Sequence, residues 1–222
     1  MSILDWSFVS LLSCALLFCI FGVVLLISFL RSRRKLKPLK RKRPPKNKKK
    51  RKQFIRMRNR LKKKAKRQLM TSIILLLLSV ATISGALFSR NYQQNHLQGK
   101  NAEVIVQSYY LLDDLELQLQ NLSKGESPQK SFKNIQNITS QLASYGNEKA
   151  DLVLKEDGQT LLNRYYSKIR QLGINLHAQK IESLQKKEVS DEYLNDVKNV
   201  KKIEKDVFTR FKINEKALKS KK

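Results

Sequence analysis

The sequence is poor in cysteine, glycine and proline, and one stretch of it has no acidic residue at all. Only 2 Cys occur among 222 residues, and both, Cys14 and Cys19, lie in an apolar run, so no disulfide framework is indicated. With 7 Gly and 4 Pro, little of the chain is low-complexity linker. Residues 31–68 contain 23 Lys and Arg but no Asp or Glu, and such a block of like charge cannot bury a core.

The formal net charge of +28 comes mostly from that block. Outside it, 23 basic residues face 18 acidic ones, which leaves a net charge of only +5. A globular basic domain would instead mix the two signs over its surface. The abundance of Lys, Asn, Gln, Leu and Ile suggests an AT-rich genome, and our hypothesis for the source is a Gram-positive bacterium.

Two long uncharged runs flank the basic block. Residues 7–30 and 69–89 contain 24 and 21 residues without a charge, and a membrane-spanning helix needs about 20 apolar residues. We therefore predict transmembrane helices at 7–30 and 69–89. The alternatives for the first run are a buried soluble helix, a cleaved signal peptide and a lipidated Cys14. The lack of a polar face and of a basic residue before the run argues against them.

The positions of the basic residues predict how these spans are oriented. Lys and Arg abut the end of the first run and the start of the second, whereas none precedes the first run. By the positive-inside rule, the basic loop is cytoplasmic. The short N-terminus, residues 1–6, and the C-terminal region, residues 90–222, then lie outside the plasma membrane.

The basic loop divides into two parts. Residues 31–47 contain Pro38, Pro44 and Pro45, which favours extended or disordered chain. Residues 48–68 have the spacing of an amphipathic helix with an apolar stripe at Phe54, Met57 and Leu61. We expect this helix to lie along the inner leaflet, either separately or as an extension of the second span.

The loop carries far more cations than orientation requires. Anionic lipid of the inner leaflet is the first candidate partner, nonspecific contact with DNA or RNA is the second, and an acidic protein is the third. A nuclear localisation signal is disfavoured by the flanking spans. The candidate contact residues are Arg31, Arg33, Arg34, Lys40, Arg41, Lys42, Arg43, Lys48, Lys49, Lys50, Arg51, Lys52, Arg56, Arg58, Arg60, Lys62, Lys63 and Lys64.

The C-terminal region has helical periodicity throughout. One apolar seam, with alternating spacings of 3 and 4, comprises Ile105, Ser108, Leu112, Leu115, Leu119 and Leu122. Further helices are expected over 132–145, over 162–176 and from a cap at Ser190, with a short helical piece at 150–154. Together with the spans, this predicts an all-α membrane protein with a bundle of about four helices. An extended dimeric coiled coil is the alternative.

No catalytic, metal-binding or cofactor-binding pattern stands out. His96 and His177 lack neighbouring ligands at metal spacing. The acidic cluster of Asp113, Asp114 and Glu116 is expected to be a solvated helix face.

Two aromatic pairs, Tyr109-Tyr110 and Tyr165-Tyr166, are candidates for a partner surface, with core packing as the alternative.

The functional expectation is a non-enzymatic, membrane-anchored scaffold or regulator of the cell envelope. Its external helices would bind an envelope protein, and its basic loop would bind the inner leaflet. A membrane tether for DNA or RNA is one alternative, and a sensor of envelope ligands is another. The oligomeric state is left open.

Overall fold

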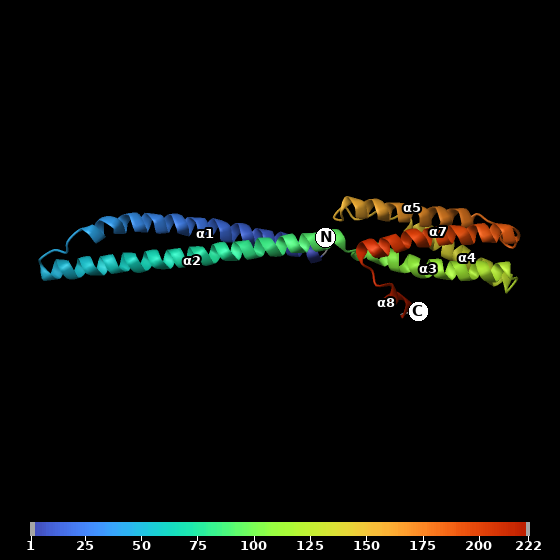
Figure 1. Ribbon diagram of the computed structural model, residues 1–222, viewed down its shortest axis with the longest axis horizontal. Coiled ribbons are helices and arrows are strands. Elements are labelled where there is room, and N and C mark those ends of the chain that lie inside the picture. The colour runs from blue at the N-terminus through green and yellow to red at the C-terminus, as the bar shows by residue number, and fades with distance from the viewer. Residues whose placement is uncertain (1–2, 221–222) are drawn as a thin grey trace. The chain divides into compact units, whose positions relative to one another are not determined.

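The computed structural model describes residues 3–220, which are helical almost throughout (Figure 1). The helices are α1 (Ile3–Arg41), α2 (Lys48–Asn95), α3 (Gly99–Ser123), α4 (Pro128–Tyr145), α5 (Glu156–His177), α6 (Ile181–Leu184), α7 (Lys187–Phe211) and α8 (Glu215–Lys219). No strand occurs between residues 3 and 220, so the all-α prediction is confirmed. The chain divides into unit 1 (Met1–Asn91) and unit 2 (Tyr92–Lys222).

In unit 1, α1 and α2 lie side by side (Figure 1) and contact one another through small residues. Ala65, Ser72, Ser79 and Ala86 of α2 recur every seven residues, and all are buried. The hydroxyl of Ser72 donates to the carbonyl of Gly22 over 2.8 Å, which requires a close approach of the two backbones. Ala81 is also a small residue of α2, but it is exposed and lies outside this seam.

Both helices of unit 1 contain a stretch long and apolar enough to cross a membrane. Away from the seam, large apolar side chains on both helices are exposed. A continuous apolar surface of this kind is unfavourable in water and matches the hydrocarbon of a bilayer. Those more than half exposed include Leu16, Leu17, Ile20, Phe21, Leu77, Val80, Leu87 and Phe88.

The helices of unit 1 extend well beyond the uncharged runs. α1 continues through Pro38 to Arg41, so the prediction of extended chain over 31–47 is wrong for residues 31–41. The reason is packing: Leu36 is buried, and Ser32 donates to Gln68 of α2 over 2.9 Å. From Lys48, α2 runs into the second apolar run without a break, as one longer helix.

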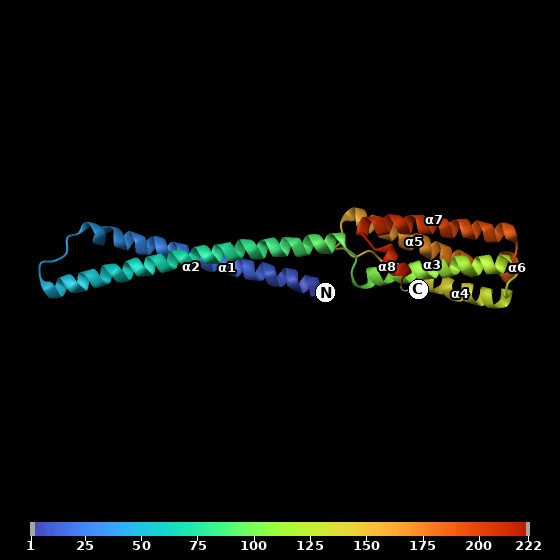
Figure 2. The ribbon, with the colours of Figure 1, turned by 60° about the horizontal axis from the view of Figure 1, so that its bottom comes forward.

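In unit 2, α3, α4, α5 and α7 pack around one apolar core (Figure 2). α3 contacts α4 and α7, and α5 contacts the same two helices, which closes the ring. The α3–α4 break falls where Gly125 and Pro128 predict it, with Gly125 at φ +76°. All six residues of the seam from Ile105 to Leu122 are buried in this core. Within unit 2 the helices therefore pack on one another rather than continuing as one long rod.

Several boundaries in unit 2 differ from those expected. Residues 150–154 form a turn instead of a short helix, because Asn101 and Asn163 side chains accept hydrogen bonds from the backbone N–H groups of Asp151 and Ala150. α7 already begins at Lys187, so Ser190 is a buried residue inside the helix rather than its cap.

Two further boundaries concern the end of α2 and the start of α5. α2 ends at Asn95 and α3 begins at Gly99, which has φ +51°, so no single helix runs from the second span through residue 101. Gly158 lies in α5 rather than in a turn, and it is buried against Phe211.

Candidate functional site

The predicted basic contact residues lie on the end of α1, the connecting residues 42–47 and the start of α2. All 18 are exposed except Arg58, which is half-buried. Within residues 31–68 the structure contains no ion pair, because this range has no carboxylate. Ion pairs such as those of Lys201 with Asp113 and Glu116 lie in unit 2. No side chain within residues 31–68 therefore neutralises the positive charges of the two helices.

The apolar stripe of the basic segment is partly buried between α1 and α2 and partly exposed on the surface. Ala65, which continues the stripe, is buried, whereas Phe54 and Leu61 are half-buried and Met57 is 50% exposed. Since Leu36 of α1 is also buried, part of the stripe expected to face lipid instead holds the basic parts of α1 and α2 together.

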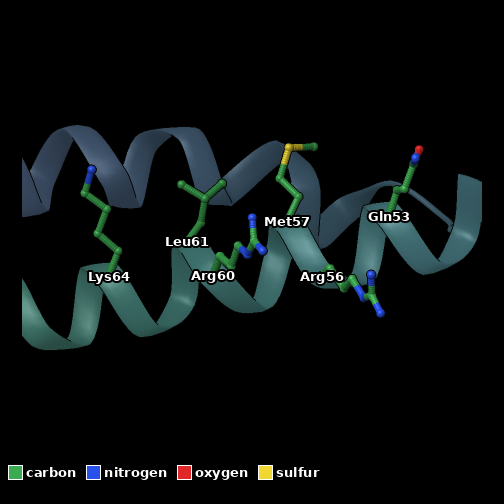
Figure 3. Close-up of a pocket in the computed structure, with 6 residues that line it drawn as sticks. All are labelled: Gln53, Arg56, Met57, Arg60, Leu61 and Lys64. Carbon is green, nitrogen blue, oxygen red and sulfur yellow. The ribbon is translucent and has the colours of Figure 1, made fainter.

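A shallow groove runs along one face of α2 in the basic segment (Figure 3). Met57 and Leu61 give it an apolar base, and three cations and one amide surround them. Cations on one helix face, beside an apolar base, offer charge-assisted hydrogen bonds to an anionic ligand. The residues that line the groove are Gln53, Arg56, Met57, Arg60, Leu61 and Lys64.

A second candidate site is a buried polar cluster in the core of unit 2. Glu204 of α7 is 3% exposed, and the Tyr165 hydroxyl lies 2.9 Å from its Oε1 atom. The same hydroxyl lies 2.8 Å from Oγ of Ser108, which in turn donates to the carbonyl of Val104 over 2.7 Å. A carboxyl, a phenol and an alcohol thus form one chain of contacts across three helices.

The number of hydrogen atoms that this polar cluster can share among its contacts can be counted. The three contacts are Glu204 to Tyr165, Tyr165 to Ser108 and Ser108 to the carbonyl of Val104. The phenol and the alcohol supply only two hydrogens, so all three contacts are hydrogen bonds only when Glu204 is protonated and donates. Burial raises the pKa of Glu204 to about 7, against the lowering effects of its bond to Tyr165 and of Lys201. Burial and the charge of Glu204 also raise the pKa of Tyr165.

Lys201, one turn before Glu204 on α7, ties two carboxylates of α3 together. Its Nζ atom donates to Asp113 over 2.8 Å and also to Glu116. Partial burial acts to lower the pKa of Lys201, but the bonds to both carboxylates outweigh it, so its pKa is raised. These two members of the acidic cluster are therefore engaged in an ion-pair network between α3 and α7, which gives them a packing role.

The tyrosine pairs are mostly part of the core. Tyr165 and Tyr166 are fully buried and Tyr109 is 6% exposed, so none of these three presents a partner surface. Tyr110 is half-buried, and its hydroxyl donates to the carbonyl of Leu218 over 3.0 Å. The core-packing alternative therefore describes three of the four residues.

A groove lies on the surface of unit 2, between α5 and α7. Leu172, Val200 and Ile203 form its base. Charges of both signs and amides surround this base, and the groove encloses about 450 Å³. Mixed charges over an apolar base are typical of surfaces that bind other proteins. The polar residues at its rim are Arg164, Lys168, Gln171, Asn175, Asp196, Asn199, Lys202 and Asp206.

The two histidines have separate local partners. The His96 ring stacks on Tyr92 with 4.0 Å between ring centroids, and Nδ1 of His177 lies 3.1 Å from the hydroxyl of Thr139. Between residues 3 and 220 no group of three or more His, Cys, Asp or Glu side chains is placed to hold a metal ion.

Glu204 was not among the predicted site residues, although its spacing in the sequence contains a signal. Val197, Val200, Val207 and Phe211 form one apolar face of α7. Glu204 is at the seam position between them, four residues after Val200 and three before Val207. A charged residue at a seam position predicts either a buried carboxyl or a break in the core, and the structure has the former.

Comparison with known protein families, with curated proteins and with solved structures found no match to this chain.

Proposed function

We propose that this protein is a non-enzymatic scaffold or regulator anchored in the plasma membrane by two spans. The observation that carries the proposal is the order of charge along two continuous helices. Uncharged runs of 24 and 21 residues flank a segment with 23 cations and no anion. The buried small residues and the Ser72 and Ser79 hydrogen bonds between α1 and α2 support a hairpin of two spans.

In the proposed topology, residues 31–68 are cytoplasmic, and both the N-terminus and unit 2 are extracytoplasmic. The cations nearest the spans, such as Arg31, Arg33 and Lys66, would contact the anionic headgroups of the inner leaflet. Each such contact is worth about 1 kcal/mol close to the surface. This interaction would hold the hairpin in one orientation.

The extracytoplasmic bundle would bind a protein of the cell envelope through the groove between α5 and α7. Its apolar base and mixed-charge rim support a protein partner rather than a small anion. The network of Glu204, Tyr165 and Ser108 lies within the core that this groove overlies, and it would fix the spacing of α3, α5 and α7.

Thiol labelling in intact cells tests the topology. Cys14 and Cys19 are replaced by Ala, and single cysteines are placed at Asn47 and at Leu152, both of which are exposed. A membrane-impermeant maleimide is expected to label Leu152→Cys in intact cells, and Asn47→Cys only after permeabilisation. The reverse pattern would exclude the proposed orientation. Labelling of both cysteines in intact cells would exclude the spans.

Photo-crosslinking tests the binding role. A photoreactive residue at Gln171, on the rim of the groove, is expected to give a discrete adduct in cells. The same residue at Gln141, on the exposed side of α4, serves as the matched control. Equal adducts at both positions, or none at Gln171, would refute a docking role for the groove.

A further inference from the structure

The basic parts of α1 and α2 continue straight from the apolar parts, and this determines how far the cations lie from the membrane. α2 has no break between Lys48 and Leu69. At about 1.5 Å per residue, Lys48 lies about 31 Å along the helix axis from the start of the second apolar run. The end of α1 at Arg41 lies about 16 Å beyond Leu30 by the same measure.

The 23 cations therefore fall into two groups. The proximal group has 10 cations in residues 31–39 and 61–68, and the distal group has 13 in residues 40–60. Headgroups extend about 5–7 Å beyond the hydrocarbon, and the field of anionic lipid decays over about 8 Å in physiological salt. Because α2 continues as one helix out of the membrane, much of the distal group lies beyond that field. Attraction to the inner leaflet therefore does not explain the distal cations.

The distal cations repel one another, and within the fold only solvent and counterions screen them. The segment contains no carboxylate, and two basic helices are held together at Leu36 and Ala65 in spite of their repulsion. A polyanion that contacts both helices would remove that repulsion. From Lys48 to Arg60 the fold thus presents its cations on a preformed helix.

The density of these charges indicates the kind of polyanion. From Lys48 to Arg60, α2 carries 8 cations in 13 residues, or one per about 2.4 Å of helix axis. Duplex DNA carries one phosphate per about 1.7 Å of its axis. Few protein surfaces approach this density, because their acidic residues are mixed with basic and neutral ones.

The segment has no means of reading bases. Its one aromatic residue, Phe54, is half-buried, so no row of rings is available for stacking. Arg56 and Arg60, one turn apart on the groove of Figure 3, can each donate bidentate hydrogen bonds to phosphate oxygens.

We propose that residues 40–60, the distal basic segment, bind the phosphate backbone of a nucleic acid without sequence preference, near the cytoplasmic face of the membrane. The inference rests on the two spans of the proposed function and adds a second ligand class to it. The proximal group contacts lipid, and the distal segment contacts DNA or RNA.

The test uses the full-length protein in nanodiscs of zwitterionic lipid. Binding of fluorescent 20-base-pair DNA and RNA duplexes is followed by anisotropy at several NaCl concentrations. The distal variant carries Lys48→Gln, Lys49→Gln, Lys50→Gln, Arg51→Gln and Lys52→Gln. The matched proximal variant carries Lys62→Gln, Lys63→Gln, Lys64→Gln, Lys66→Gln and Arg67→Gln. Both remove five charges, and Gln keeps a helix propensity close to that of Lys.

The wild-type protein is expected to bind both duplexes with a steep salt dependence. The distal variant should weaken binding by about 100-fold or more at ~0.1 M salt and reduce the slope of log K against log salt by about 4. The proximal variant should weaken binding by less than about tenfold. Similar affinity for unrelated duplex sequences is also expected.

Three results would overturn the proposal. The first is an equal or larger loss in the proximal variant. The second is a wild-type protein that fails to bind either duplex. The third is loss of duplex binding when anionic lipid is placed in the same nanodisc, because the distal segment would then lie on the leaflet. Thiol labelling tests the topology separately, so failure of one experiment leaves the other interpretable.

Discussion

Replacing Glu204 with Gln is expected to change how the stability of unit 2 depends on pH. Burial raises the pKa of Glu204 from 4.5 to about 7. The folded protein therefore binds this proton more tightly than the unfolded chain does. The resulting stability is fully present below pH 4.5, and it is lost as the pH rises through about 7.

The size of the effect follows from the same values. The difference between 4.5 and about 7 corresponds to about 3 kcal/mol of unfolding free energy. For a unit of this size, that free energy corresponds to a Tm change of roughly 10 °C. In Glu204→Gln the amide cannot ionise but can still contact Tyr165. The variant should therefore match the wild type near pH 4 and exceed its Tm by about 10 °C at pH 8.5.

The assay is thermal unfolding of the full chain in detergent, monitored by near-UV circular dichroism of tyrosine. All 7 Tyr lie in unit 2 and the single Trp, Trp6, lies in unit 1, so the tyrosine signal reports unit 2 alone. Glu182→Gln, at an exposed position, is the control. Identical pH profiles for wild type and Glu204→Gln would refute the assignment of a raised pKa to the buried cluster.

The remaining predictions concern packing and connections. Gly173→Ala should lower the Tm of unit 2 by several degrees, because its Cβ atom would lie 2.7 Å from backbone atoms of α4. Asn101→Ala should destabilise unit 2 by about 1–3 kcal/mol in urea unfolding, since Asn101 bonds the turn at residues 149–151 through both side-chain atoms. With the native cysteines removed, Ala15→Cys and Ser79→Cys should form a disulfide on mild oxidation, because the Ser79 hydroxyl lies 3.2 Å from the carbonyl of Ala15. The control pair, Ala15→Cys and Val80→Cys, should not form one. Equal crosslinking of both pairs would contradict the packing of α1 on α2 through this seam.

The candidate sites could be predicted from sequence to different extents. The basic segment is visible as composition, since a run of 23 cations without an anion needs no fold to be recognised. The role of Ala65 was harder to foresee, because a stripe facing lipid and a stripe facing a second helix have the same spacing. The buried cluster brings together Ser108, Tyr165 and Glu204, which are far apart in the chain and follow no motif.

Local physics explains which boundaries could be predicted. Gly125 and Pro128 end and start helices through their own backbone preferences, so the break between α3 and α4 follows from the sequence. The turn at 150–154 depends on hydrogen bonds from Asn101 and Asn163, which belong to other elements. Such contacts override the local helical tendency of the segment, and no window of sequence contains them.

By itself, the sequence determined the helical class, the two apolar runs and the position of the basic block, because periodicity, hydropathy and charge are properties of neighbouring residues. The tertiary structure decided what those residues contact. It carried α1 as a helix through Pro38 to Arg41, placed Ala65 against α1, and buried Glu204 beside Tyr165. Burial and proton affinity depend on groups that are distant along the chain, so they arise only when the helices pack together.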